Sequence, residues 1–164
     1  MASWAEFEAA APELADEGKR LLYQFGVGLG FLATVREDGG PRLHPVCPVI
    51  AADELYVFVV PSPKRGDLRR DGRYALHSYP PEEVDDEFYA TGRATEVQDP
   101  DIRAEVAEAY HDQVAEGWSL FALDIERCLH AKYRHRGDWP PTYTKWTDPN
   151  VSALREGNSR GIGT

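Results

Sequence analysis

The sequence has few cysteines and no long hydrophobic run. Its 164 residues contain two cysteines, Cys47 and Cys128, which are too few for a disulfide framework. No apolar stretch approaches the roughly 20 residues that a membrane-spanning helix needs. The N-terminus lacks the basic region and apolar stretch of a signal peptide. We therefore expect a reduced, cytoplasmic protein that does not contact a membrane.

Positive charge is also scarce, because 18 basic residues face 28 acidic ones and the net charge is −10. Nucleic acid is excluded as the main partner, since a phosphate backbone requires a basic surface. Residues 64–73 are the exception, with five basic and two acidic side chains. A positive region in an acidic chain indicates a small anionic ligand, although a solvated helix face explains the charge equally well.

The common catalytic signatures are missing. There is no phosphate-binding loop, no Gly-x-Ser-x-Gly elbow and no His-Glu-x-x-His motif. Gly26, Gly28 and Gly30 do not form a dinucleotide fingerprint, because they follow a helical stretch and Phe31 stands at the position of the third glycine. Cys128, His130 and His135 lie close in sequence, but no second ligand pair accompanies them. We interpret these three residues as a half-exposed strand face and predict no metal site.

The sequence pattern favours strands over helices. Residues 4–24 are expected to be helical, divided at Pro12, with Leu14, Leu21, Leu22 and Phe25 on the apolar side. A second helix begins at the N-cap Asp99, repeats Ile102, Val106, Tyr110 and Val114 at four-residue spacing, and ends at Gly117. Alternating apolar residues predict six strands, at 31–36, 42–51, 54–60, 74–79, 88–97 and 119–133.

These elements predict a mainly β (α+β) fold with an antiparallel sheet and flanking helices. No linker or repeat divides the chain. We expect a single domain over residues 1–149 and a polar C-terminal tail over residues 150–164.

The segment from Pro41 to Val49 is the first candidate binding element. Alternation places Arg42, His44 and Val46 on one face of the strand. Pro45 and Pro48 lack an amide hydrogen, so neighbouring backbone groups are left open to a ligand such as an isoalloxazine ring. An edge strand protected by prolines is the alternative interpretation, and for this segment alone it is the stronger one.

The second candidate element follows the strand that ends near Val60. Ser62 and Pro63 can begin a short helix whose first turn contains Lys64 and Arg65. Open amides at a helix start bind phosphate. Cations there are unfavourable for an isolated helix, and an anionic ligand would compensate them.

Together these segments resemble the flavin-binding split-barrel family related to pyridoxamine 5'-phosphate oxidase. The resemblance rests on Arg-x-His-Pro-Val on one strand, and on Ser-x-Lys-Arg-x-x-Leu-Arg-Arg-Asp-x-Arg-Tyr-Ala-Leu after a later strand. It covers roughly residues 15–146 and includes the order of elements. It implies a six-stranded antiparallel split β-barrel that binds flavin mononucleotide (FMN) at the interface of a homodimer.

The resemblance also implies roles for the matching residues. Lys64, together with Ser62, Arg65 and Leu68 of the same motif, would form the phosphate end of the cofactor site. The ring or ribityl chain would be lined by Arg42, His44, Pro45 and Val46, with Thr34 as a hydrogen-bond partner. Trp139 and Trp146 are candidates to cover the ring from the partner chain, and ordinary packing of a C-terminal arm explains them equally well.

The sequence departs from the vitamin B6 oxidase itself. That enzyme has a C-terminal motif with an arginine that holds the substrate phosphate, whereas Arg155 and Arg160 stand in an unrelated context here. We therefore expect a flavin-dependent oxidoreductase acting on a small molecule that the sequence does not identify, with His44 or Tyr74 as candidates for proton transfer.

Three alternatives remain open at this point. The cofactor could be the deazaflavin coenzyme, whose polyglutamate tail would use Arg69, Arg70 and Arg73. The chain could instead hold a flavin or a haem without turnover, with His44 or His77 as an axial ligand. The least specific alternative is a structural β-domain without a cofactor.

Overall fold

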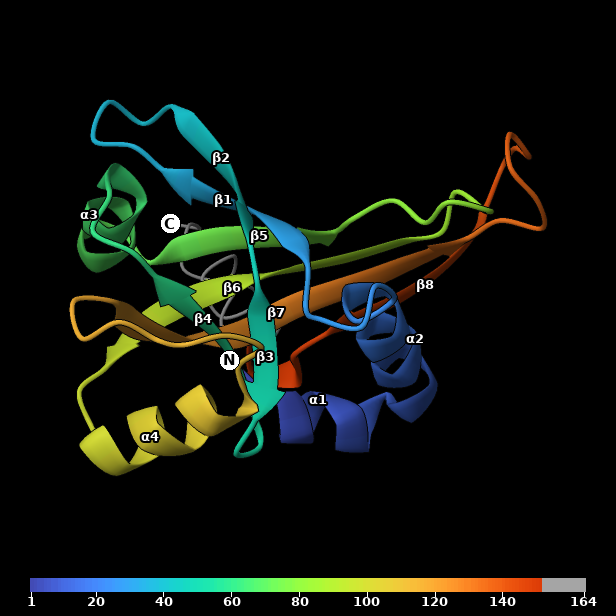
Figure 1. Ribbon diagram of the computed structural model, residues 1–164. Helices are drawn as coiled ribbons and strands as arrows, with labels where there is room; N and C mark the ends of the chain where they lie inside the picture. Colours follow the sequence, from blue (N-terminus) through green and yellow to red (C-terminus); the bar gives the residue numbers. More distant parts are fainter. Residues whose placement is uncertain (152–164) are drawn as a thin grey trace, which may run out of the picture.

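A curled antiparallel sheet forms the body of the protein in the computed structural model, which describes residues 1–151 (Figure 1). The strand order is β2-β1-β5-β6-β7-β4-β3, and β8 pairs with β7. The strands are β1 Gly30–Val35, β2 Pro41–Val46, β3 Pro48–Ala51, β4 Glu54–Val59, β5 Arg73–Ser78, β6 Glu87–Val97, β7 Ser119–Lys132 and β8 Thr142–Thr147. This architecture confirms the predicted mainly β (α+β) split barrel.

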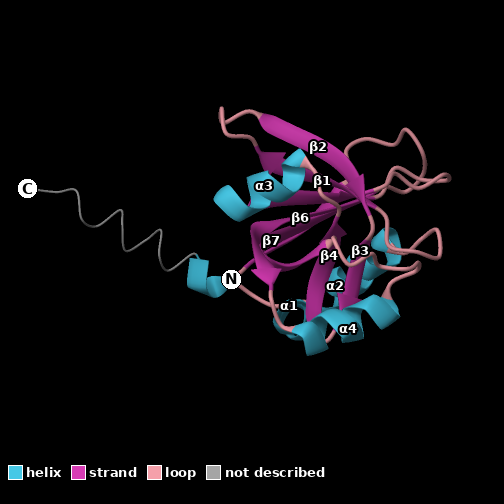
Figure 2. Cartoon of the chain, turned by 60° about the vertical axis from the view of Figure 1, so that its left-hand side comes forward, coloured by secondary structure: helices cyan, strands magenta, loops and turns pink. Residues whose placement is uncertain are grey.

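The curl of the sheet follows from its connectivity. Strands β2 and β3 stand at opposite ends of the strand order, yet only Cys47 separates them in the chain. The sheet must therefore bend until its two ends meet near Cys47. Figure 1 shows β2 and β3 running one after the other across the other strands, and Figure 2 shows the same two strands from a second direction.

The predicted count of six strands was too low. The expected strand at 42–51 is divided at Cys47, because the flanking Pro45 and Pro48 have no amide hydrogen to donate to a neighbouring strand. Strand β8 was missed because its residues are almost all exposed and show no apolar alternation. Its pairing with β7, from Arg127–Thr147 to Lys132–Thr142, defines it instead.

The two N-terminal helices agree with the prediction. Helix α1 (Trp4–Ala10) begins with a capping box, in which the Ser3 hydroxyl accepts from the Glu6 amide at 3.0 Å and the Glu6 carboxylate accepts from the Ser3 amide at 2.9 Å. Helix α2 (Pro12–Leu22) has the proline in its first turn. Phe25 does not share the apolar side, because it lies beyond α2 and is 44% exposed.

Helix α4 (Pro100–Ala109) begins at Asp99 as expected but ends earlier than Gly117. Tyr110 is extended, with φ −77° and ψ 147°. This conformation sets its ring 5.3 Å from the ring of Phe58 and 6.3 Å from that of Trp118. Aromatic packing therefore replaces the last helical turns, and Val114 joins the same hydrophobic cluster from an irregular segment.

The main core lies between the inner face of the sheet and helices α1 and α2. Leu32, Leu76, Phe88 and Phe121 are fully buried there. Gly18 of α2 lies directly over Phe88, where a Cβ atom would stand 2.6 Å from the ring. Helix α3 (Pro63–Arg70) adds Leu68 to this core. Within residues 1–151, no helix is long and apolar enough to span a membrane.

The outer face of β1, β2, β5 and β6 has a different character. Phe31, Ala33, Ala75 and Tyr89 point outward and are only half-buried, and Leu43 is 63% exposed. Two loops extend beyond this face, residues 79–86 between β5 and β6 and residues 133–141 between β7 and β8. We call this pair of loops the arm; it extends to the right in Figure 1.

Candidate functional site

The start of α3 is open to an anion. Ser62 is the N-cap residue, but its hydroxyl donates to the Val60 carbonyl at 2.9 Å and makes no capping bond. Pro63 occupies the first turn, and no acidic residue lies in that turn. The positive end of the helix dipole therefore has no compensating side chain of its own.

Strand β2 places Arg42, His44 and Val46 on one face, as the sequence predicted, and this face meets α3. Arg42 and His44 are half-buried and Val46 is buried, whereas Pro41, Leu43 and Pro45 are exposed. Pro45 therefore lies on the outer face, away from Arg42 and His44. Val46 and Leu68 belong to the hydrophobic core, so they anchor β2 and α3 to it and are not free to contact a ligand.

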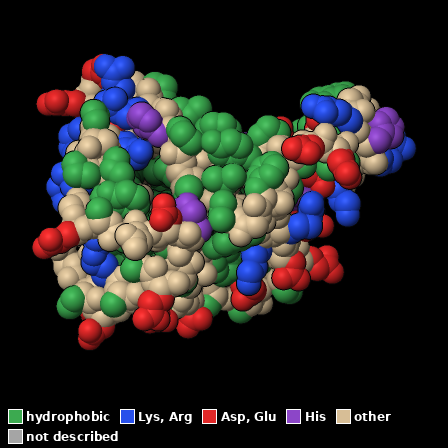
Figure 3. Space-filling view, viewed as in Figure 1, with side chains coloured by type: hydrophobic (Ala, Val, Ile, Leu, Met, Phe, Trp, Pro, Cys, Tyr) green, Lys and Arg blue, Asp and Glu red, His purple; other side chains and the backbone are tan. Residues whose placement is uncertain are grey.

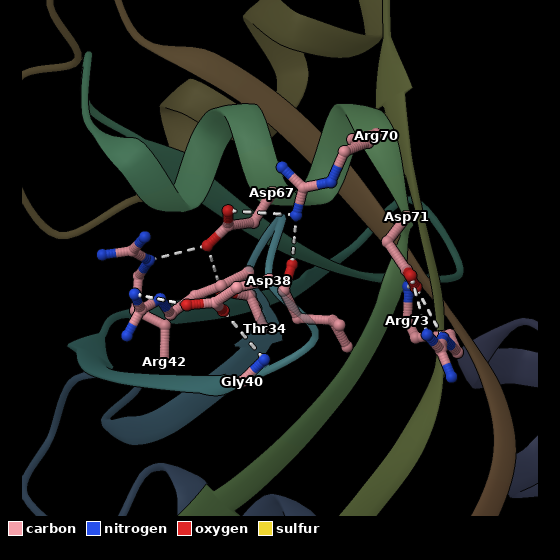
Figure 4. Close-up of polar contacts among 10 residues, drawn as sticks. Thr34, Asp38, Gly40, Arg42, Asp67, Arg70, Asp71 and Arg73 are labelled. Carbon is pink, nitrogen blue, oxygen red and sulfur yellow. Dashed lines mark hydrogen bonds and ion pairs between the residues drawn. The ribbon is translucent and has the colours of Figure 1, made fainter.

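Asp67 of α3 holds the region together (Figure 4). Its carboxylate is buried and accepts from Thr34 Oγ1 at 3.0 Å, from Arg42 Nε at 2.7 Å and from Arg70 Nη2 at 3.3 Å. Burial favours the protonated acid, but the hydrogen bonds from Arg42, Thr34 and Arg70 outweigh it and hold the pKa of Asp67 below its usual range. Asp67 thereby orients Arg42 and Thr34.

Sequence reasoning did not single out Asp67. The available signal was its position as a carboxylate inside the most basic segment of the chain, where a buried counter-ion for several arginines is expected.

The arginines of the basic segment are all occupied. Arg65 donates to the Gly117 carbonyl at 3.1 Å, and Arg69 donates to Glu96 at 2.7 and 2.6 Å. Arg70 reaches Asp67 and the Val35 carbonyl, and Arg73 pairs with Asp71 at 2.6 Å. Most of the positive charge of residues 64–73 is therefore compensated within the protein.

Lys64 is the exception. Its ammonium group has no hydrogen bond or ion pair with any of residues 1–151, although the side chain is half-buried. Partial burial lowers the pKa of Lys64. A desolvated cation without a partner is unfavourable in the protein alone, and an anion at this position would stabilise it.

His44 lies in the same electrostatic environment. Its Nε2 atom is buried and has no hydrogen-bond partner among the described residues. Burial is the main factor that lowers the pKa of His44, and the charges of Lys64 and Arg42 lower it further. We call Lys64, His44, Arg42 and Asp67 the α3 site.

Several residues proposed from the sequence lie elsewhere. Trp139 is 73% exposed on the arm, whereas Trp146 on β8 packs 5.1 Å from the ring of Phe7. Tyr74 is buried, and its hydroxyl donates to the Asp124 carbonyl at 3.2 Å. Desolvation raises the pKa of Tyr74 well above its usual value. His77 points to the outer face of the sheet, opposite Phe31 and Tyr89 in the strand register.

Cys128, His130 and His135 do not come together as ligands. Cys128 and His130 are buried on β7, whereas His135 is exposed on the arm. Burial raises the pKa of the Cys128 thiol and lowers that of His130. The described part of the chain contains no cluster of three residues that could hold a metal ion.

The fold is similar to those of several solved structures. A haem-binding protein from Mycobacterium smegmatis superposes with a TM-score of 0.60 at 18% identity, over 79% of this chain and 57% of that protein. A pyridoxamine 5'-phosphate oxidase-related, FMN-binding protein from Nostoc punctiforme gives 0.55 at 15% identity, over 88% and 97% of the two chains. General stress protein 26 from Bacillus anthracis gives 0.56 at 14% identity, over 80% and 97%.

No protein-family model matches the sequence, and comparison with curated proteins finds no match. The chain spans little more than half the length of the Mycobacterium smegmatis protein. At these identities the similarity shows a shared fold. The comparisons thus confirm the split-barrel fold that the sequence resemblance implied.

Proposed function

We propose that the chain binds FMN at the α3 site, with the phosphate at the first turn of α3. The observation that carries this proposal is Lys64, a half-buried ammonium without a partner among residues 1–151 at a helix start without an acidic residue. A phosphate there meets the positive end of the helix, the Lys64 ammonium and the Lys64 backbone amide. Pro63 has no amide hydrogen, and the Arg65 amide already donates to the Ser62 carbonyl at 3.1 Å.

Two residues of β2 extend the site beyond the phosphate. Arg42 uses Nε to hold Asp67 at 2.7 Å, which leaves its terminal nitrogens to donate to the cofactor. His44 contributes the Nε2 atom that lacks a partner among the described residues. Fixing Arg42 through a buried carboxylate reduces the conformational entropy that binding would otherwise cost.

FMN fits this site better than the deazaflavin coenzyme does. A polyglutamate tail requires several unpaired cations along a groove. Arg69 and Arg73 are instead paired with Glu96 and Asp71, and Arg70 is held by Asp67. A single phosphate requires only the local charge that Lys64 provides.

The proposed assembly is a homodimer formed through the outer face of the sheet. Leu43 is 63% exposed and pairs with the half-buried Ala33 in the strand register, and the half-buried Ala75 and Tyr89 follow on β5 and β6. Figure 3 shows hydrophobic side chains gathered between the β1–β2 hairpin and the arm. A contiguous apolar face of this kind is typical of a protein–protein interface.

The proposed activity is that of a flavin-dependent oxidoreductase acting on a small molecule. When bound, the flavin supplies the electron-transfer chemistry. The chain's own residues bind the phosphate, orient the cofactor along β2 and exclude water from one side of it. His44 is the remaining candidate for holding a proton at this site, because the Tyr74 hydroxyl is buried against backbone carbonyls.

Haem binding without turnover is the second candidate function. It is favoured by the buried Nε2 of His44, which has a lone pair available for iron when the neutral ring carries its proton on Nδ1. One of the structures with this fold is described as haem-binding. Lys64 fits either ligand, since a haem propionate is also an anion, and it is the helix start beside Lys64 that favours the flavin phosphate.

Absorbance spectroscopy of the purified protein, followed by separate titrations with FMN, the deazaflavin coenzyme and haem, tests these functions. We expect uptake of FMN with a two-band yellow spectrum, and a large loss of affinity in Lys64→Ala. Lys19→Ala is the matched control, because Lys19 is exposed on α2 away from the site. A sharp band near the violet edge would support haem instead, and no binding of any of the three would refute a cofactor at this site.

A further inference from the structure

The arm and the outer face of the sheet border an open cavity of about 610 Å³. Three aromatic side chains line it, Phe31 of β1 and Tyr133 and Trp139 of the arm. The ring of Phe31 is held in place by stacking on Tyr79, with centroids 4.3 Å apart and planes 12° from parallel. A volume of this size and walls of this kind are typical of small-molecule sites.

The two loops of the arm are bonded to each other, so the cavity wall is already formed. Arg136 Nη1 donates to the Glu82 carbonyl at 3.0 Å, and the Gly137 amide donates to Asp85 at 2.7 Å. Arg134 pairs with Asp138 within the second loop, at 2.8 and 3.1 Å. Both arginines of the arm therefore have partners, and so do Asp85 and Asp138.

Glu87 is the one carboxylate lining the cavity that has no partner among the described residues. It is the first residue of β6, it is half-buried, and it has no hydrogen bond or ion pair with residues 1–151. The arm itself carries five carboxylates against two guanidinium groups. The local potential is therefore negative, and Glu87 offers a cationic ligand a carboxylate that no arginine or lysine already occupies.

His77 adds a directional hydrogen-bonding group. Its Nδ1 lies 2.6 Å from the Ser78 carbonyl oxygen, which only accepts hydrogen bonds, so Nδ1 carries the proton. In the neutral ring Nε2 is then a hydrogen-bond acceptor. Because His77 lines the cavity, a ligand that brings an N–H donor is favoured over one that brings only carbonyl groups.

We infer that this cavity binds a planar aromatic cation that carries N–H donors. Its ring would pack against Trp139 and Phe31, and its charge and N–H groups would meet Glu87 and His77. The site lies on the outer face of the sheet, whereas Lys64 and Asp67 lie at α3 on the inner side. It is therefore a second ligand site, independent of the flavin proposed above.

Fluorescence titration with ethidium, a planar aromatic cation with amino groups, tests this inference on the full chain. We expect saturable binding of one ethidium per chain and no saturable binding of fluorescein, an anionic planar dye. Replacing a charge-assisted contact by a neutral one in Glu87→Gln should weaken ethidium binding about tenfold. Trp139→Leu should weaken it as well and should abolish the accompanying quenching of tryptophan fluorescence.

Glu83→Gln is the matched control, because Glu83 is an exposed arm carboxylate that does not line the cavity. It should leave ethidium affinity unchanged, as should Lys64→Met at the flavin site. Equal affinities of Glu87→Gln and the unmodified protein would overturn the inference. Equal losses of affinity in Glu87→Gln and Glu83→Gln, or tight binding of fluorescein, would also overturn it. An absence of saturable ethidium binding would overturn it too, and would be expected if a second copy of the chain fills the cavity.

Discussion

Strand β1 carries Thr34 on its inner face and Phe31 on its outer face, and the surroundings of these two residues are opposite in charge. Thr34 donates to Asp67, which also binds Arg42 and lies one helical turn from Lys64. Phe31 instead faces the cavity that borders Glu87 and the acidic arm. One strand thus separates a positive site from a negative one.

In both places the charged groups at the site have partners within the protein, except for one. At α3 the arginines have carboxylate or carbonyl partners and the ammonium of Lys64 has none among residues 1–151. At the cavity, Asp85 and Asp138 have partners and Glu87 has none among the same residues. The number of charged residues in the sequence does not single out Lys64 and Glu87. Only the structure shows that these two charged groups lack a partner among the described residues.

The largest expected effect is on stability, from Asp67→Asn. The substitution leaves Arg42 and Arg70 without their buried counter-ion and should lower the free energy of unfolding by about 3 kcal/mol. Urea denaturation of the cofactor-free protein measures it. Asp71→Asn breaks the exposed pair with Arg73 and should change stability little. Equal losses in the two variants would mean that Asp67 does not organise the α3 site.

The next effect concerns the outer face. Leu43→Lys places a charge in the proposed dimer interface and should raise the dimer dissociation constant by about a hundredfold. Analytical ultracentrifugation over a range of concentrations measures it. Val60→Lys is the control, since Val60 is also an exposed apolar residue but lies next to α3. A monomeric unmodified protein, or equal dissociation in both variants, would contradict the proposed interface.

A smaller effect is expected in the pH dependence of stability. Folding lowers the pKa of His44 below the usual histidine value of about 6.5. Just below that pH, His44 is therefore more protonated in the unfolded chain than in the folded protein. Stability should therefore increase as the pH is raised towards that value, and His44→Gln should reduce this increase.

Inorganic phosphate separates His44 from the other histidine with a lowered pKa. An anion beside Lys64 offsets the cations around His44, so phosphate should raise the pKa of His44 in a proton NMR titration. His130 lies under α2, remote from α3, and its pKa should stay unchanged. Equal shifts at both residues, or none at His44, would contradict an anion site at α3.

The smallest effect is that of Lys64→Met on the cofactor-free protein. Removing a half-buried ammonium without a partner should leave the free energy of unfolding unchanged or raise it by less than about 1 kcal/mol. Thermal unfolding with and without FMN measures it. A clear loss of stability without FMN would show that Lys64 has a structural role and is not reserved for a ligand.

Local patterns in the sequence predicted much of the fold. Pro12 divides the N-terminal helices, Asp99 begins α4, and alternation on β2 sets Arg42 and His44 towards α3. Interactions distant in sequence were not predicted. Strand β8 is defined only by its pairing with β7, and α4 ends early because Tyr110 packs on Phe58 and Trp118.

The sequence singled out three residues of the α3 site as candidates, and the structure brings Lys64, Arg42 and His44 into one region. They could be singled out because each belongs to a short local pattern, on β2 or at the start of α3. The importance of Asp67 was missed, since its partners Thr34 and Arg42 lie 33 and 25 residues away in the chain. The pairing of Arg69 with Glu96 was missed for the same reason.

The most direct test of the central claim compares the affinities of FMN and riboflavin, which differ only in the phosphate, for the unmodified protein and for Lys64→Met. If the phosphate lies at α3, FMN binds at least about tenfold more tightly than riboflavin to the unmodified protein, and most of that difference disappears in Lys64→Met. If the two flavins bind equally well, or if the preference for FMN persists in Lys64→Met, the phosphate does not lie at the start of α3.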